Sequence, residues 1–148
     1  MLTTTSEYAI RALTYIAQQE VGKPVLAREI ATNTGVPANY ISKILRDLAH
    51  GGILGSTRGV GGGFRLIRPA KQIRLGDIVA PFENVGHRHR CPFGDPACTE
   101  SKPCSAHAFY KPVQGAYNKF LDKTTLQAVA AATKIKRPTK GKGAKKKR

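Results

Sequence analysis

The feature that most constrains the fold is one clean amphipathic helix followed closely by a glycine-dense turn. Four apolar residues keep the i, i+3, i+4, i+7 spacing that places them on one helix face: Ile41, Ile44, Leu45 and Leu48. Pro37 suits the first position of this helix, and Gly51-Gly52 ends it. The turn over 58–63 lies between apolar runs at 53–57 and 64–68, and this pattern predicts a β-hairpin.

Two helices are predicted upstream, over 6–19 and 26–33. The first has Thr5 or Ser6 as its cap, and its apolar face holds Ala9, Ala12, Leu13 and Ile16. The second ends at Gly35 and is expected to bury Leu26, Ile30 and Ala31. A helix, a helix–turn–helix pair and a hairpin, in this order, predict a winged helix-turn-helix. In that fold the third helix enters the major groove of DNA, and the hairpin follows the backbone or the minor groove.

Three helices are predicted downstream, over 75–83, 107–121 and 125–129. A long helix exposed on a small lobe usually packs against a twin, so we expect a homodimer. The fold class is therefore mostly α with a small β-hairpin: a winged helix-turn-helix DNA-binding domain plus a long C-terminal dimerisation helix. The predicted domains are a DNA-binding domain (1–83), a cysteine-rich loop (84–107), dimerisation helices (108–132) and a disordered basic tail (133–148).

The charge of the chain favours a polyanionic partner. Of 148 residues, 25 are basic and 9 acidic, a formal charge of +16, and nine of the basic residues fall in the last fifteen positions. The rest of the chain still carries 16 basic against 9 acidic residues. We expect double-stranded DNA rather than a membrane, because no amphipathic anchor accompanies the charge. The alternatives are a tail that only solubilises the chain, or a basic protein that binds nucleic acid without sequence preference.

Other classes of protein are not supported by the sequence. No apolar run approaches the ~20 residues needed to cross a bilayer, and the N-terminus lacks the regions of an export signal, so we expect a cytoplasmic protein. We find no nucleophile–base constellation, paired acids or nucleotide fingerprint. We therefore expect neither an enzyme nor a small-molecule substrate.

All three cysteines lie within seventeen residues, on a loop rich in proline and glycine: Cys91, Cys98 and Cys104. Three is an odd number for disulfides, and soft thiolates suit a thiophilic metal or an iron–sulfur cluster. Zinc sites prefer tighter Cys-x2–4-Cys spacings, although zinc and redox-active thiols remain alternatives. His107 follows Cys104 closely, but it also suits a helix start. Glu7 has an ordinary explanation as the i, i+4 partner of Arg11.

The predicted DNA-binding residues fall into three groups. The polar face of the third helix should meet the major groove through Asn39, Tyr40, Ser42 and Lys43. Arg28 and Arg46 are expected on phosphates. The hairpin should approach the backbone or the minor groove with Arg58, Arg65 and the glycines Gly59, Gly61 and Gly62, because glycine permits close approach.

Taken together, these motifs resemble the Rrf-type bacterial transcription regulators, whose members include IscR, NsrR and CymR. The likeness covers roughly residues 1–132, and its most specific parts are Ser6-Glu7-Tyr8-Ala9-Ile10-Arg11-Ala12-Leu13, the glycine-rich segment 57–66 and the cysteine trio. The resemblance implies a dimeric winged-helix repressor or activator. Its operator binding would answer to a cluster, a redox change or a metabolite.

The resemblance also implies a ligand set for an iron–sulfur cluster, either 2Fe–2S or 4Fe–4S, in the loop over 84–107. Cys91, Cys98 and Cys104 match the thiolate ligands, and Cys104-Ser105-Ala106-His107 matches the Cys-x-x-His of IscR-like proteins, with His107 as fourth ligand. Glu7 stands where NsrR-like proteins carry a carboxylate and is the alternative fourth ligand. The implied signals are redox state, nitric oxide, or iron and cluster supply. A winged-helix regulator based on thiols or zinc, without iron, is the alternative.

Overall fold

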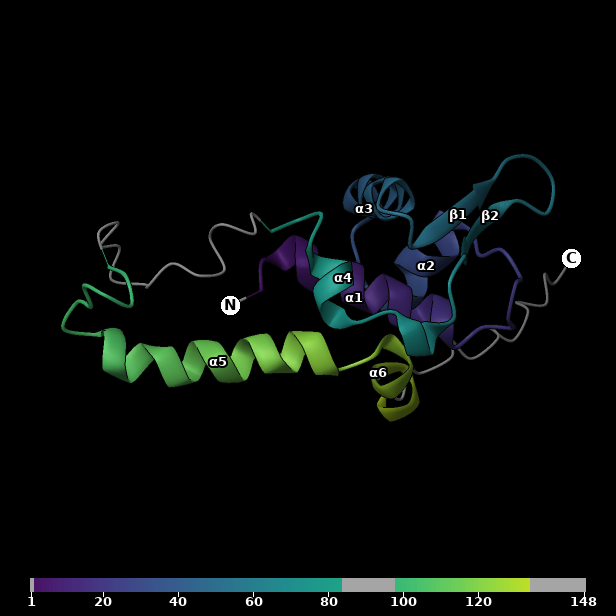
Figure 1. Cartoon of the computed structure of the whole chain (residues 1–148). Helices are drawn as coiled ribbons and strands as arrows, with labels where there is room; N and C mark the ends of the chain where they lie inside the picture. The colour runs from purple at the N-terminus through teal and green to yellow at the C-terminus, as the bar shows by residue number, and fades with distance from the viewer. Residues whose placement is uncertain (1, 84–97, 134–148) are drawn as a thin grey trace, which may run out of the picture.

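The computed structural model describes residues 2–83 and 98–133 of the chain (Figure 1). Within them the chain is mostly helical with one two-stranded hairpin, which confirms the predicted fold class. The elements in chain order are α1 (Thr4–Ala17), α2 (Ala27–Thr34), α3 (Ala38–His50), β1 (Leu54–Thr57), β2 (Gly63–Leu66), the 3-10 helix η1 (Ala70–Gln72), α4 (Leu75–Val79), α5 (His107–Lys123) and α6 (Leu126–Ala132).

Helix α1 begins two residues earlier than predicted. Its cap is Thr3, whose Oγ1 accepts a hydrogen bond from the Ser6 amide at 3.3 Å, so the prediction of Thr5 or Ser6 is wrong. Ser6 is fully buried instead, and its hydroxyl donates to Glu83 Oε1 at 2.9 Å. The earlier start turns Ser6 towards the end of α4, where a distant carboxylate satisfies it.

The helix–turn–helix pair forms as predicted, with one exception at its start. Gly35 ends α2 in the left-handed conformation at φ 69°, which glycine adopts without a Cβ penalty. Ile30 is fully buried, whereas Leu26 is 41% exposed. Leu26 is the cap of α2 and has extended backbone, so its side chain leaves the buried face of the helix; its predicted burial is wrong.

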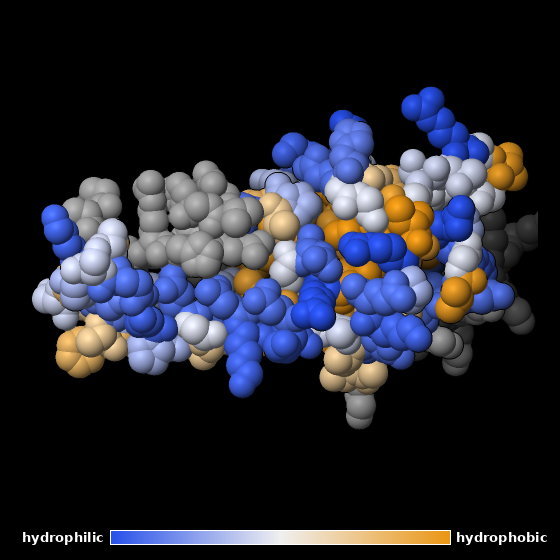
Figure 2. All heavy atoms as spheres, in the orientation of Figure 1, coloured by the Kyte–Doolittle hydropathy of each residue, from blue (hydrophilic) through white to orange (hydrophobic). Residues whose placement is uncertain are grey.

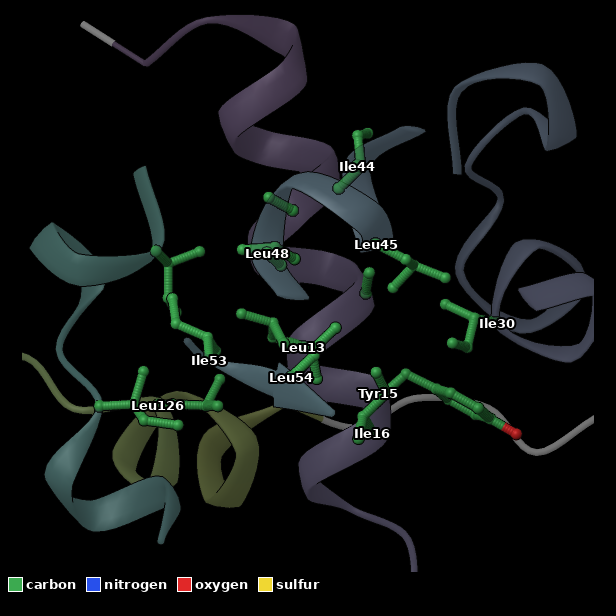
Figure 3. Close-up of a cluster of buried hydrophobic side chains, with 14 of the residues drawn as sticks. Leu13, Tyr15, Ile16, Ile30, Ile44, Leu45, Leu48, Ile53, Leu54 and Leu126 are labelled. Atoms are coloured by element: carbon green, nitrogen blue, oxygen red, sulfur yellow. The ribbon is translucent and has the colours of Figure 1, made fainter. Parts of the chain in front are cut away.

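The core joins α1, α2, α3, β1 and α6 (Figure 3). All four residues of the predicted stripe on α3 are buried to 2% exposure or less. They pack with Leu13 and Ile16 of α1, Ile30 of α2, and Leu126 of α6. Burying a leucine or isoleucine stabilises a fold by about 1.5–3 kcal/mol, so this one stripe holds α3 firmly while its other face stays in solvent.

The hairpin has a third partner that the sequence pattern does not reveal. Strands β1 and β2 pair antiparallel from Leu54↔Leu66 to Thr57↔Gly63. Val25, just before α2, adds an isolated bridge to Phe64, and each backbone amide donates to the other residue's carbonyl at 2.8 Å. A Cβ on Gly63 would lie 2.6 Å from the Val25 carbonyl oxygen, so glycine is required for this approach.

Helix α4 ends at Val79, four residues short of the predicted end, since Pro81 has no backbone N–H to continue the ladder. Helix α5 extends away from the body (Figure 1). Leu121 is its one buried residue, while Phe109, Val113 and Phe120 are 82%, 61% and 47% exposed. Figure 2 shows apolar side chains near the outer end of α5. In the described ranges, no helix combines the length and apolar character needed to span a bilayer.

Candidate nucleic-acid interface and metal centre

The polar face of α3 is presented to solvent along its length. The side chains predicted for the major groove and for phosphate contact are all exposed: Asn39, Tyr40, Ser42, Lys43 and Arg46. The opposite face is fixed in the core, so the helix offers these groups from a rigid base. Lys43 remains 79% exposed although its Nζ lies 3.6 Å from Asp47 Oδ2, one turn along. An exposed pair of this kind is weak, and the ammonium can exchange its partner for a phosphate or a base edge.

Tyr40 is supported by Tyr8 of α1, which in turn contacts Arg11. Its ring lies 6.1 Å from that of Tyr8, tilted by 59°, and the Arg11 guanidinium stands 5.8 Å from the centre of the Tyr8 ring. Sequence reasoning did not find these two supports. The predicted ion pair between Arg11 and Glu7 does not form within 4.0 Å among the described residues, because Arg11 turns over the ring instead.

The hairpin tip is exposed at Arg58, Gly59 and Gly61, and Arg65 is exposed on β2. Gly62 differs from the other glycines because it is buried within the turn. Its amide donates to the Gly59 carbonyl at 3.0 Å, and a Cβ on Gly62 would lie 2.2 Å from the Thr57 carbonyl oxygen. Gly62 therefore closes the turn that presents the tip. Arg28 is exposed on α2, the helix that precedes α3.

Two of the three cysteines and His107 meet at the beginning of α5. Cys98 Sγ lies 3.3 Å from His107 Nδ1 and accepts a hydrogen bond from the Cys104 amide at 3.4 Å. The His107 amide donates to the Cys104 carbonyl at 3.0 Å, which ties the loop to the first turn of the helix. Cys98 and Cys104 are half-buried, and no disulfide joins these two described cysteines to each other. The local fold thus brings a thiol and an imidazole into contact.

Charged residues surround the imidazole on its other side. Glu100 Oε2 lies 3.9 Å from His107 Nε2 and accepts a hydrogen bond from Lys111 Nζ. The Lys111 ammonium, through this bond and its charge, lowers the pKa of Glu100, and His107 lowers it further. A carboxylate beside the far nitrogen of a histidine favours the tautomer that leaves the near nitrogen available as a ligand.

The complete ligand set lies partly outside the described residues. Cys91 belongs to the undescribed segment 84–97, and its role stays a prediction. Across residues 2–83 and 98–133, no three His, Cys, Asp or Glu side chains are arranged to hold a metal ion. Glu7 is exposed on the first turn of α1, at a different place from the start of α5 (Figure 1). Within one chain, the fold brings His107 and not Glu7 to the thiols.

The donors that are present fit a thiophilic centre. In a tetrahedral site, sulfur binds zinc at about 2.3 Å and nitrogen at about 2.0 Å, so two such ligands lie roughly 3.5 Å apart. The 3.3 Å between Cys98 Sγ and His107 Nδ1 is close to that separation. Thiolate and imidazole are ligands for both iron–sulfur clusters and zinc. The pair is therefore chemically suited to either, with further ligands.

The contacts of Glu83, at the edge of the cysteine segment (residues 84–107), were not predicted from the sequence. Glu83 is the last described residue before that segment, and its Oε1 accepts from the Ser6 hydroxyl at 2.9 Å and from the Thr3 amide at 3.1 Å. It thereby anchors the start of the cysteine segment to the cap of α1. A carboxylate with no nearby sequence partner gives no local signal of such a contact.

Comparisons with known proteins agree with this geometry. Residues 2–132 match the Rrf2 family, described as an iron-dependent transcriptional regulator. The chain is 31% identical over 125 residues to the protein rrf2 of Nitratidesulfovibrio vulgaris, across 84% of this chain and 83% of that one. It is 28% identical over 125 residues to the HTH-type transcriptional regulator IscR of Cronobacter sakazakii, across 84% and 76% of the two chains.

A solved structure shares the fold. The structure of CymR, the global cysteine regulator of B. subtilis, superimposes with a TM-score of 0.74 over 90% of this chain and 98% of that one, at 22% identity. A likeness over most of both chains shows that they share the fold. The chain therefore belongs to the Rrf2 family and is a DNA-binding transcriptional regulator rather than an enzyme.

Proposed function

We propose that this regulator binds its operator under the control of an iron–sulfur cluster held by Cys91, Cys98, Cys104 and His107. The observation that carries the proposal is the contact of Cys98 Sγ with His107 Nδ1 at 3.3 Å, with Cys104 hydrogen-bonded to the same sulfur. The description of the family as iron-dependent and the similarity to IscR support iron over zinc. Such a cluster supplies redox chemistry and reactivity towards oxidants and nitric oxide.

The DNA-binding part of the proposal rests on α3. Asn39, Tyr40, Ser42 and Lys43 read base edges in the major groove, and Arg28 and Arg46 contact phosphates. Arg58, Arg65, Gly59 and Gly61 meet the backbone or the minor groove, whereas the predicted contact of Gly62 is dropped because Gly62 is buried within the turn. Arg28, Lys43, Arg46 and Arg65 are exposed on elements that also carry core residues, and Arg58 is exposed in the hairpin turn.

The active form is a two-fold dimer formed through α5. Phe109, Val113 and Phe120 are exposed at a spacing that places them along one side of the helix. Exposed apolar residues on a projecting helix are stabilised when a second copy covers them. Two copies place two α3 helices on successive major-groove turns, about 34 Å apart.

Helix α5 links the proposed cluster ligands to the body that carries α3. His107 is its first residue, and Leu121 near its end is buried against the body, with the Leu121 backbone packed on Gly76 of α4. His107 and Leu121 are fourteen positions apart on this helix, so α5 spans about 21 Å between them. Ligation by Cys104 and His107 fixes the first turn of α5, and Glu83 anchors the other end of the cysteine segment to α1.

Anaerobic purification tests the proposal directly. We expect a coloured protein with iron and sulfide in similar amounts, and loss of the visible absorbance in Cys98→Ala. Ser105→Ala, in the same loop and exposed, is the matched control and should keep the colour. A colourless wild type without iron contradicts the proposal, and zinc in its place supports the thiol- or zinc-based regulator instead.

A further inference from the structure

We propose that a basic cleft on the winged-helix body binds a small organic anion, a carboxylate or phosphate carried by an apolar group. The cleft has a volume of about 690 Å³ and lies between the end of α1 with its following loop, the segment from β2 to η1, and α6. Ligand sites commonly fall between about 300 and 1,000 Å³. Of the residues assigned to DNA or metal above, Arg65 alone lines it, and binding there requires no cluster.

The charges around the cleft are unbalanced. Four cationic side chains line it, from three different segments: Lys23, Arg65, Arg68 and Lys71. Glu20 is the single acidic residue among the described residues of the lining. In the described part of the chain, none of the four cations has a carboxylate within 4.0 Å. Like charges held around one hollow create a positive potential there, and an anion entering it is stabilised by all four.

Arg68 gives the cleft a specific donor. Its Nε is buried and has no hydrogen-bond partner among the residues that the structure describes, although the residue as a whole is half-buried. Buried donors are nearly always paired, so an unpaired one beside a cleft indicates a missing acceptor. A guanidinium presents parallel N–H groups that match the two oxygens of a carboxylate or phosphate. Arg68 is therefore the residue expected to hold the anionic group.

The rest of the lining suits an apolar body rather than a bare ion. Ile16, Leu66 and Ala130 contribute apolar surface from α1, β2 and α6. The Gln18 amide is already used, since its Nε2 donates to the carbonyls of Ala130 at 2.8 Å and Thr133 at 2.7 Å. These bonds hold α6 against α1 and fix one wall of the cleft. A ligand with both an anionic group and an apolar group uses the whole site.

The DNA backbone is another anionic partner that the cations of this cleft could contact. The cleft favours the small molecule because a duplex reaches exposed cations without filling an apolar hollow. The two occupants also differ in what Arg68→Gln does to DNA binding. Removing a phosphate contact weakens the affinity for all DNA sequences and reduces its salt dependence, whereas removing a small-ligand contact does neither.

Phenyl phosphate binding to the full chain tests the inference by calorimetry. Benzyl alcohol serves as the neutral apolar probe and inorganic phosphate as the bare anion. We expect phenyl phosphate to bind at least about tenfold more tightly than either, and Arg68→Gln to weaken it by about tenfold or more, in line with the loss of a charge-assisted hydrogen bond. Arg68→Lys should retain part of the affinity. Lys119→Gln, an exposed charge on α5 outside the cleft, should retain all of it.

Three results would overturn the inference. One is equal binding of phenyl phosphate by the wild type and a folded Arg68→Gln protein. Another is equal binding of phenyl phosphate and inorganic phosphate, which shows a counterion surface. The third is a loss of DNA affinity in Arg68→Gln as large as in Arg58→Ala, without any added probe. Should Arg68→Gln fail to fold, Lys71→Gln, at an exposed position of the same lining, replaces it under the same criteria.

Discussion

At the scale of single residues, the decisive contacts are a few side-chain interactions, some between positions far apart in the chain and one across a short loop. Ser6 and Thr3 both donate to Glu83, about eighty positions away, and Cys98 meets His107 across a loop. Each contact joins two otherwise separate elements at the boundary of the cysteine segment. The cap of α1 and the pair of Cys98 and His107 are therefore positioned by a few side chains rather than by the broad core.

Ser6→Ala tests the first of these contacts. The hydroxyl is fully buried and donates to Glu83 Oε1, so its removal takes a charge-assisted bond from the start of the cysteine segment. We expect a loss of about 1–2 kcal/mol in the free energy of unfolding, measured with urea. The exposed Ser105→Ala should change the stability by less than about 0.5 kcal/mol. Equal stabilities of the two variants would contradict the assigned contact.

Lys43 is the residue whose DNA contact is tested most simply. It is 79% exposed on the polar face of α3, and its replacement leaves the core untouched. Lys43→Ala should weaken operator binding by about 1–3 kcal/mol if the ammonium contacts a base, and should change the salt slope by about one if it contacts a phosphate. Lys119→Ala, an exposed charge on α5, is the control. An operator affinity unchanged in both variants shows that α3 is placed wrongly.

At the scale of elements, local patterns were sufficient where one face of an element is buried. The apolar stripe on α3 predicted both the buried and the exposed side of that helix. Gly35 correctly predicted the end of α2, and the glycine-rich turn correctly predicted the hairpin. The bridge between Val25 and Phe64 was missed because it is a single pair between distant segments with no periodicity of its own. The Leu26 error has a local origin instead, since a cap residue can have the composition of the helix without its backbone geometry.

Gly62→Ala and Gly115→Ala separate a glycine that the fold requires from one that it does not. A Cβ on Gly62 would meet the Thr57 carbonyl oxygen at 2.2 Å, whereas nothing lies within 4 Å at Gly115 in α5. We expect Gly62→Ala to destabilise the chain by about 1–3 kcal/mol and Gly115→Ala to stabilise it by about 0.5–1 kcal/mol. Thermal unfolding of the two variants gives the signs. A neutral Gly62→Ala means that the hairpin turn has been described wrongly.

At the scale of the whole molecule, α5 connects the cysteines to the DNA-binding body and carries the exposed apolar residues. The cysteine trio suggested a thiophilic centre, and the family resemblance implied the ligand set, which stays a proposal. The structure brings Cys98, Cys104 and His107 together. Cys91 and the basic tail over 134–148 lie outside the described residues, and the predicted domain limits stay predictions. Nothing in a linear pattern revealed the cleft, because three separate segments form it.

Val113→Glu tests the dimer. Val113 is 61% exposed on α5, so a monomer tolerates the change, whereas a paired α5 would bury an unpartnered carboxylate. We expect light scattering to show a dimer for the wild type and a monomer for the variant, with operator affinity reduced at least about tenfold. Lys119→Glu should remain dimeric. A wild type that is monomeric at micromolar concentration contradicts the proposed assembly.

Control of operator binding by a cluster is tested most directly by measuring operator affinity anaerobically on one preparation. The affinity is measured first with the cluster intact and then after the cluster has been removed by chelation. If a cluster controls operator binding, we expect its removal to change the affinity for the operator at least about tenfold, in either direction. The same treatment of Cys98→Ala should cause no such change. Identical affinities for the two forms of the wild type would contradict control by a cluster and leave a DNA-binding regulator that does not sense a cluster.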